Sequence, residues 1–402
     1  MGQFSRCHRG ELMAWTSPPS QPSATMPQPI HLMHTVRSLW GAGMEGGIVN
    51  VCNRLPEEFR VSICALAPLE TFSGSIQRPG SQFFTLPPSR QEGVDWTLVP
   101  RLARLFRRTK VDLVHSHTWG TFLYSVLAAR LTGTAIIHGE HGRNMFELAE
   151  HNPAKDWAKR LLGRRVDRMI TVSNDLRREW IERFGIPERK IVWIPNGVDV
   201  TRFRPDPADR AAARRHFGLP ESGFVIGSVG RLDPIKNYRL MIDAAQIVLA
   251  KKEQVSITVL GDGPLQEELE RQVAELGLAG RVHLLGWRLE SPRFLQTLDI
   301  FVLPSISEGM SNSVLEALAT GLPVVCPALP THREVITTGV DGILMENFTK
   351  ESLAEMLMHL LDDEAERLRL SREARETACR QFSLQRMVDR HASLYREVLG
   401  RD

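Results

Sequence analysis

The fold is decided by one stretch of the sequence, Ser307 to Pro323, which reads SEGMSNSVLEALATGLP. It follows an apolar run that ends near Leu303 and is typical of a buried strand. A strand that passes through a glycine-containing loop into a helix is the place where open α/β sheets bind ligands. We therefore expect an α/β protein with a ligand site at this turn.

Two glutamates stand at this turn, Glu308 in the loop and Glu316 one turn into the helix. Each carboxylate can accept hydrogen bonds from adjacent hydroxyl groups, so the pair suits a polyhydroxylated ligand. A second interpretation concerns Glu316 alone, because Ser313 to Glu316 matches a capping box and Gly321 matches a helix stop. Both interpretations of Glu316 stay open, whereas Glu308 has no comparable structural role.

Apolar runs alternate with amphipathic helical stretches from Ile30 onward, which is typical of βαβ units and a mainly parallel sheet. The expected strands are residues 30–36, 61–66, 111–115, 135–138 and 169–172 in a first series, and 224–230, 255–261, 282–286, 300–304 and 323–326 in a second. At about 150 residues per domain, a chain of 402 residues predicts two domains. The expected limits are 30–200 and 201–380, with a terminal helix at 381–402 and a proline-rich, disordered leader at 1–29. Met26 stands just before the first strand and is an alternative first residue.

The composition excludes several classes of protein. Lys and Arg number 50 against 47 Asp and Glu, and a net charge of +3 is too balanced to predict nucleic acid as a partner. The five cysteines are scattered without a C-x-x-C pair, so neither a disulfide framework nor a zinc ribbon is indicated, and a reducing compartment fits. Since no run of about 20 apolar residues occurs, we expect a cytoplasmic protein whose only membrane association is peripheral.

Two expected helices of the first half are strongly basic. Residues 101–110 carry five basic residues and no acidic one, and residues 155–168 carry six basic residues against two acidic ones. A basic amphipathic helix can lie on an anionic membrane surface, or its apolar stripe can pack on the sheet. Packing is the more common outcome, and both interpretations stay open.

A second glycine-containing turn offers cations. Residues 227–237 follow a buried strand, and Arg231 and Lys236 in this segment suit a ligand that carries phosphate. The alternative is an exposed basic turn. No Walker loop occurs, and Gly261 to Gly263 lacks the third glycine of a dinucleotide fingerprint, so dehydrogenase chemistry is weakly supported.

The first half supplies a glycine-rich loop, residues 41–47, and four histidines at strand ends: His115, His117, His138 and His141. Such a loop favours an anion at a helix N-terminus. The histidines suit either a metal, with the H-x-H pair on one strand face, or hydrogen bonds to a polar substrate. Because no cysteine or Asp cluster completes a ligand set and no Asp-x-Asp pair occurs, we expect no metal and no cofactor.

Taken together, these segments resemble glycosyltransferase family four, whose members have the GT-B fold of two Rossmann-like domains facing across a cleft. The resemblance covers Ile30 to the C-terminus and is carried by residues 42–45, 114–117, 141–142, 172–173, 194–199, 230–237, 260–264 and 308–316. Residues 137–143, IHGEHGR, also resemble a bacterial branch associated with exopolysaccharide production in species that contain exosortase. One departure is Ala42, where the family commonly has the first glycine of a pair.

The resemblance implies a donor site made by Gly43, Arg231, Lys236, Glu308, Ser313, Val314 and Glu316. In such enzymes Arg231 and Lys236 would neutralise the donor diphosphate and Glu316 would hold the ribose hydroxyls. Glu308 would contact the donor sugar and His141 would line the reacting centre, while His117 is a candidate on the acceptor side. A terminal helix similar to residues 381–402 crosses back to the first domain in the GT-B fold.

The resemblance thus implies a retaining, metal-independent glycosyltransferase that uses a nucleotide-sugar donor and a lipid-linked or polysaccharide acceptor in exopolysaccharide or cell-surface glycan synthesis. Fixed cations would stabilise the departing diphosphate in place of a metal. The alternatives are a non-hydrolysing nucleotide-sugar epimerase of the same fold and a non-catalytic nucleotide-sugar-binding subunit.

Overall fold

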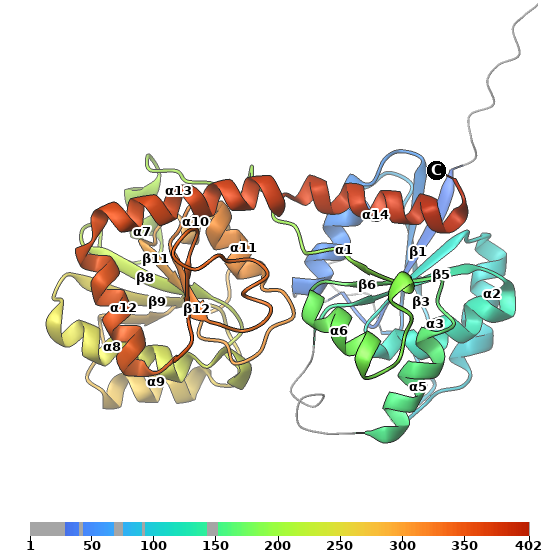
Figure 1. The fold of residues 1–402 in the computed structure, drawn as a ribbon, viewed down its shortest axis with the longest axis horizontal. Helices are drawn as coiled ribbons and strands as arrows, with labels where there is room; N and C mark the ends of the chain where they lie inside the picture. The colour runs from blue at the N-terminus through green and yellow to red at the C-terminus, as the bar shows by residue number, and fades with distance from the viewer. Residues whose placement is uncertain (1–28, 40–42, 68–74, 91–92, 143–151, 402) are drawn as a thin grey trace, which may run out of the picture.

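The computed structural model describes residues 29–39, 43–67, 75–90, 93–142 and 152–401. Nearly all of the expected leader, as well as Ala42, lies outside these residues. Within them the chain forms two parallel sheets, with strand orders β3-β2-β1-β4-β5-β6-β7 and β10-β9-β8-β11-β12-β13 (Figure 1). Each sheet belongs to one α/β domain, as the alternation of strands and helices predicts.

The first sheet lies between two layers of helices. Its strands are β1 (Ile30–Val36), β2 (Phe59–Ala65), β3 (Gln82–Thr85), β4 (Leu113–His117), β5 (Ala135–Glu140), β6 (Arg168–Thr171) and β7 (Ile191–Trp193). One face packs on α1 (Gly43–Arg54) and α14 (Leu384–Leu399). The other packs on α2 (Leu98–Thr109), α3 (Trp119–Thr132), α5 (Pro153–Gly163) and α6 (Asn174–Glu182).

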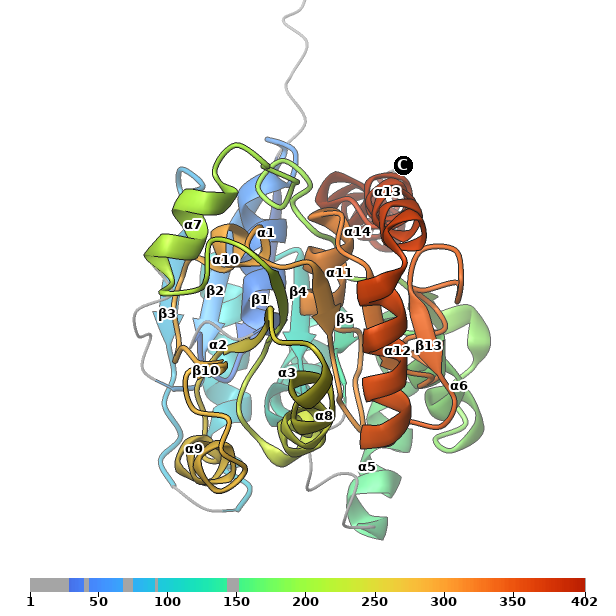
Figure 2. The ribbon, with the colours of Figure 1, turned by 90° about the vertical axis from the view of Figure 1, so that its left-hand side faces the viewer.

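The second sheet is built in the same way (Figure 2). Its strands are β8 (Phe224–Val229), β9 (Val255–Leu260), β10 (Val282–Leu284), β11 (Ile300–Val302), β12 (Val324–Pro327) and β13 (Ile343–Met345). One face packs on α10 (Ser291–Leu295), α11 (Asn312–Ala319) and α13 (Glu364–Gln381), and α7 (Arg210–His216) contacts α10. The other packs on α8 (Tyr238–Lys251), α9 (Gln266–Glu275) and α12 (Lys350–Asp362). The strand order reverses between β8 and β11, where such sheets bind ligands.

Each predicted strand corresponds to an observed one, and the differences have physical causes. The structure adds β3, β7 and β13, which have only three or four residues and therefore too little pattern to be recognised. The predicted helix at residues 155–168 is wrong in its last part. Helix α5 ends at Gly163, and Arg168 begins β6, because the Asp167 carboxylate accepts the backbone N–H of Ile136 in β5 at 2.7 Å.

The chain passes between the domains twice, and the two passages are hydrogen-bonded to each other. Val198 donates to the Phe382 carbonyl oxygen at 2.8 Å, and Leu384 donates to the Val198 carbonyl oxygen at 2.9 Å. A Cβ atom on Gly197 would lie 2.8 Å from the Cα of Leu384 and 2.9 Å from the Cβ of Met387. Only glycine therefore fits at this crossing. Helix α14 then packs on α1, so the expected return of the terminal helix to the first domain is confirmed (Figure 1).

The two basic helices differ in how they pack. Helix α2 buries Leu102, Leu105 and Phe106 against the sheet while most of its arginines face outward, which confirms the packing interpretation for this helix. In α5 only Leu162 and Gly163 are buried, and Trp157 is 66% exposed. The packing interpretation alone therefore does not account for α5.

We expect Gly197→Ala to lower the free energy of unfolding by about 1–3 kcal/mol, because the new methyl group forces apart the paired crossings. Gly46→Ala is the matched control, since a Cβ atom there meets nothing within 4 Å inside helix α1. It should raise stability by about 0.4–1 kcal/mol. Urea denaturation of both variants measures the difference, and equal effects would contradict the packing assigned to Gly197.

Candidate active site

The turn at residues 307–312 touches the first domain through its backbone. A Cβ atom on Gly309 would collide with the carbonyl oxygen of His141 and lie 2.9 Å from the Cα of Gly142. Nearby, Asn312 donates through Nδ2 to the Gly43 carbonyl oxygen at 3.0 Å. The edges of the two sheets at which ligands are expected to bind, at the carboxyl ends of the strands, therefore meet at this turn.

The first passage of the chain between the domains also contacts this turn. Asn196 donates through Nδ2 to Oδ1 of Asn312 at 2.9 Å and to the Met310 carbonyl oxygen at 3.2 Å. Asn312 is thus held from two sides, by Asn196 and by the start of α1. Because α1 begins at Gly43, Gly46 and Gly47 lie inside the helix, and the predicted loop over residues 41–47 is wrong for its last part.

Lys236 and Glu308, which the sequence treats as separate contacts, are in direct contact. The Lys236 Nζ donates to Oε1 of Glu308 at 2.5 Å, and the Ser305 hydroxyl donates to the same oxygen at 2.6 Å. Their side chains are 18% and 11% exposed. The turn that carries Lys236 is capped by Asp233, which accepts the backbone N–H of Lys236 at 3.2 Å. A phosphate that binds Lys236 therefore shares this cation with Glu308.

Arg231 stands at the edge of the same turn. Its side chain is 70% exposed, and its Nε lies 3.7 Å from a carboxylate oxygen of Asp233. Gly230 beside it is required for packing, since a Cβ atom there would lie 2.6 Å from the Tyr238 hydroxyl and 3.5 Å from the Cε of Lys236. Arg231 is therefore exposed at the turn, whereas Lys236 is held by Glu308.

The capping interpretation of Glu316 is wrong. The residue that caps α11 is Ser311, whose Oγ accepts the backbone N–H of Val314 at 3.4 Å. Ser313 already lies inside the helix, and its hydroxyl pairs with that of Ser311 at 3.1 Å. The helix begins earlier than predicted because Ser311 has the extended backbone of a cap. The expected stop is confirmed at Gly321, where φ is 72°.

Without a capping role, the Glu316 carboxyl has no hydrogen-bond partner among the residues that the structure describes. Removal from water raises its pKa to about 7, and the positive charge of Arg202 offsets part of this shift. A carboxyl group poised in this way gains hydrogen bonds when neighbouring hydroxyl groups arrive.

The histidines gather on one face of the first sheet. His115 and His117 are two residues apart on β4, and their ring centroids lie 4.1 Å apart, which confirms that the H-x-H pair shares a face. Parallel register sets His34 of β1 beside His115. His34 is not among the histidines predicted from the sequence. Its signal was the period of two along β1, which places His34 on the same face as Leu32 and Val36.

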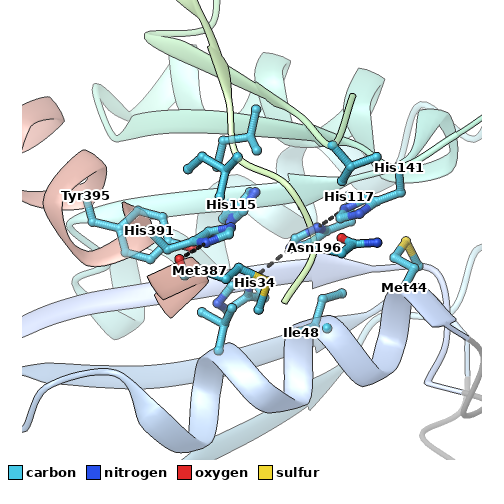
Figure 3. Close-up of a pocket in the computed structure, with 15 residues that line it drawn as sticks. His34, Met44, Ile48, His115, His117, His141, Asn196, Met387, His391 and Tyr395 are labelled. Atoms are coloured by element: carbon cyan, nitrogen blue, oxygen red, sulfur yellow. Dashed lines mark hydrogen bonds between the residues drawn. The ribbon is translucent and has the colours of Figure 1, made fainter. Parts of the chain in front are cut away.

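Hydrogen bonds join three of these imidazoles in a row (Figure 3). The Nδ1 of His34 lies 2.9 Å from Nε2 of His117, and the Nδ1 of His117 lies 2.9 Å from Nε2 of His141. Gly139 of β5 lies beneath the rings. A Cβ atom there would lie 2.9 Å from Nε2 of His115 and 3.1 Å from Nε2 of His141, so a glycine is needed at this position.

Helix α14 covers the histidine cluster. The Tyr395 hydroxyl and Nδ1 of His115 are 2.8 Å apart, and His391 lines the same small cavity of about 30 Å³. Burial lowers the pKa of His34 to about 3 and those of His141 and His391 to about 4. These imidazoles are therefore neutral at pH 7.

The histidines that could hold a metal ion differ from those predicted from the sequence. Nitrogens of His34, His115 and His117 all lie within 4.8 Å of one another and could hold an ion. His138 does not join them, because the alternation of β5 turns it to the opposite face. There its Nδ1 bonds the Ser116 hydroxyl at 3.0 Å.

Comparisons with known proteins agree with this arrangement. Residues 41–202 match the family model described as Glycosyltransferase Family 4, and residues 209–377 match that described as Glycosyl transferases group 1. A UDP-Gal:alpha-D-GlcNAc-diphosphoundecaprenol alpha-1,3-galactosyltransferase of Escherichia coli is 30% identical over 305 residues, which are 74% of this chain and 78% of that enzyme. A D-inositol 3-phosphate glycosyltransferase of Thermobispora bispora is 31% identical over 328 residues, or 75% and 74% of the two chains.

Among solved structures, the HepE protein of Anabaena in complex with UDP and glucose superposes with a TM-score of 0.79 at 20% identity, over 92% of this chain and 100% of that one. The two sheets and this likeness define the GT-B fold. The chain belongs to glycosyltransferase family 4, and it is an enzyme that transfers sugar.

We expect the raised pKa of Glu316 to appear in the stability of the protein. Between pH 4.5 and 7 the native state keeps a proton that the unfolded chain releases, so this group makes the free energy of unfolding fall as pH rises through that range and level off above it. In Glu316→Gln the side chain does not titrate, so this contribution to the pH dependence of the free energy of unfolding is lost. Its stability relative to the unsubstituted protein should therefore rise from pH 5 to pH 7, and a constant difference in urea unfolding would contradict the assignment.

Proposed function

We propose that the enzyme is a retaining, metal-independent glycosyltransferase that takes its sugar from a nucleotide diphosphate and gives it to a lipid-linked or polysaccharide acceptor. The observation that carries the proposal is the contact between Lys236 and Glu308 at the edge of the second sheet, opposite the histidines of the first. The Escherichia coli relative, by its name, uses UDP-Gal and an acceptor linked to diphosphoundecaprenol. The resemblance of residues 137–143 supports a place in exopolysaccharide synthesis.

In this proposal the donor lies across the cleft. Lys236 and Arg231 bind the diphosphate from the second domain, and the N-terminus of α1 at Gly43 favours the same negative charge from the first. Glu316 accepts hydrogen bonds from the ribose hydroxyls, with Ser313 and Val314 beside it at the start of α11. Glu308, held by Lys236 and Ser305, contacts the donor sugar.

The sugar transfer proceeds on one face of the ring. The acceptor oxygen bonds the anomeric carbon as the bond to the diphosphate oxygen breaks, and the electron pair stays on the diphosphate. The acceptor proton moves to the departing phosphate oxygen. Preorganised cations lower the energy of this charge development. In this proposal Glu140 is not a nucleophile, because alternation along β5 places it with His138, 3.9 Å away, on the face opposite His117.

The first test is the identity of the donor. Each nucleotide sugar is added to the full chain, and thermal unfolding is followed. A ligand at about 100 times its Kd adds roughly 2.7 kcal/mol of stability. The bound donor is then incubated with lipid-linked acceptors, and release of nucleoside diphosphate only with an acceptor supports transfer. Turnover of the donor without any acceptor would indicate an epimerase instead, and binding with no turnover would indicate a binding subunit.

We expect Lys236→Ala to lower kcat by about 10²–10³-fold, because it removes a cation aimed at the departing diphosphate. The control is Arg239→Ala, which removes a cation of α8 that pairs with Glu268 away from the turn. Initial rates of nucleoside diphosphate release, measured with saturating donor and acceptor, distinguish the two variants. Equal rates for Lys236→Ala and the unsubstituted enzyme would refute the site.

A lipid-linked acceptor requires access to a membrane, and no helix of the described residues is long and apolar enough to span one. We propose that α5 docks on an anionic bilayer. It carries the exposed Trp157 and Arg160, and the exposed Arg164 follows its last residue directly. Tryptophan at the interface and cations beside it are the side chains that such docking uses.

Removing Arg160 of α5 and Arg164 at its C-terminal end, as Arg160→Ala with Arg164→Ala, should weaken binding to phosphatidylserine vesicles by about 2 kcal/mol, or roughly thirtyfold. The control removes two exposed arginines of the second domain, Arg215 and Arg333. Vesicle flotation at fixed salt measures both. Similar losses in the two double variants would show that net charge alone, and not α5, governs binding.

A further inference from the structure

The row of three imidazoles connects the buried interior of the first domain with the cleft. His34 forms the inner end, and its Nε2 is fully buried with no hydrogen-bond partner among the described residues. His117 stands in the middle and uses both ring nitrogens. His141 forms the outer end. It is half-buried, uses Nε2 toward His117, and its Nδ1 is not one of the buried atoms without a partner.

The tautomers of the three rings depend on one another, because hydrogen bonds connect the rings. A neutral imidazole has one N–H and one bare nitrogen. His117 must therefore donate to one neighbour and accept from the other, so both hydrogen bonds run in the same direction. Burial keeps all three rings neutral, because it lowers the pKa of each of them. Only two states of the row remain, one for each direction.

The inner end decides between these two states. If the bonds run inward, the hydrogen of His34 lies on Nε2, and an N–H group is buried without an acceptor. If they run outward, His34 donates through Nδ1 and leaves only a bare nitrogen unpaired at Nε2. Buried N–H groups without a partner are rarer in proteins than buried acceptors without one. The outward direction is therefore favoured, and it places a hydrogen on Nδ1 of His141.

We propose that His34 and His117 are positioning residues that hold His141 in the tautomer with its hydrogen on Nδ1, so that His141 meets the substrate as a hydrogen-bond donor and not as a base. The partner it suits is an oxygen of the bound sugar. This role rests on the proposed function, in which the departing diphosphate takes the acceptor proton and no imidazole is needed for that step.

The neighbouring groups leave this row intact. His115 bonds Tyr395 through Nδ1, and His391 bonds the Met387 carbonyl oxygen through Nδ1, so neither takes a nitrogen from the row. A metal held by His34, His115 and His117 competes with the row, because both ring nitrogens of His117 are already hydrogen-bonded, one to His34 and one to His141. The hydrogen-bonded row is therefore the better account of the cluster.

The test is the imidazole ¹⁵N spectrum of the full chain with labelled histidines, recorded without substrate. Long-range proton–nitrogen correlations distinguish a protonated from a bare ring nitrogen, and single substitutions assign the signals of the 13 histidines. We expect a single tautomer at His141 with hydrogen on Nδ1. A hydrogen on Nε2 of His141 would overturn the proposal.

Two variants test the coupling. His34→Phe keeps a ring of similar size but removes the donor, and His141 should lose its single tautomer and show averaged signals. His31→Phe is the matched control. It changes another buried histidine of β1, which bonds Ser62 and not the row, and should leave the His141 signals unchanged.

An unchanged His141 signal in His34→Phe would show that the row does not set the tautomer of His141.

Addition of one equivalent of Zn²⁺ to the full chain tests the metal interpretation. Joint shifts of His34, His115 and His117 would assign the cluster to a metal and overturn the proposal, whereas unchanged signals support it. Because all spectra are recorded without substrate, the result is independent of whether the enzyme proves to use the proposed donor.

Discussion

The backbone contact between Gly309 and the His141–Gly142 turn is the constraint on which the active site depends. It brings the ligand edge of the second sheet against that of the first, and any side chain at Gly309 would separate them. Asn312 completes the contact by bonding Gly43 and Asn196. The cation and carboxylates of one domain and the imidazoles of the other therefore lie at the same cleft.

The return of the terminal helix is the second requirement. Helix α14 packs on the first sheet and supplies Tyr395 and His391 to the histidine cluster. The crossing at Gly197 pairs with the crossing at Leu384, so the two connections between the domains behave as one joint. Closure of the domains over a donor would bend the chain here, because such motions are absorbed at a few connecting residues.

Much of the fold could be predicted from the sequence, because buried parallel strands are continuous apolar runs and each run is followed by a helical pattern. The strands β3, β7 and β13 were not predicted. Three or four residues carry too little pattern to decide between strand and loop, so equally short strands such as β10 and β11 could be predicted while these three were missed. The helix predicted at residues 155–168 was too long because pairing of Asp167 with β5 outweighs helical spacing. The cap of α11 was misplaced by two residues, because Ser313 has a glutamate three residues later and so matches a capping box, whereas the extended backbone that marks the true cap at Ser311 is not visible in the sequence.

The sequence by itself determined the residue types at the ligand edges: the cations Arg231 and Lys236, the carboxylates Glu308 and Glu316, and the histidines that end the strands of the first half. These follow from local order, since a turn after a strand always lies at the sheet edge. Only the tertiary structure decided which of them touch. The pairing of Lys236 with Glu308 spans 72 residues, and that of His34 with His117 spans 83. Such contacts depend on which strands become neighbours in each sheet and in what register, which no local pattern specifies.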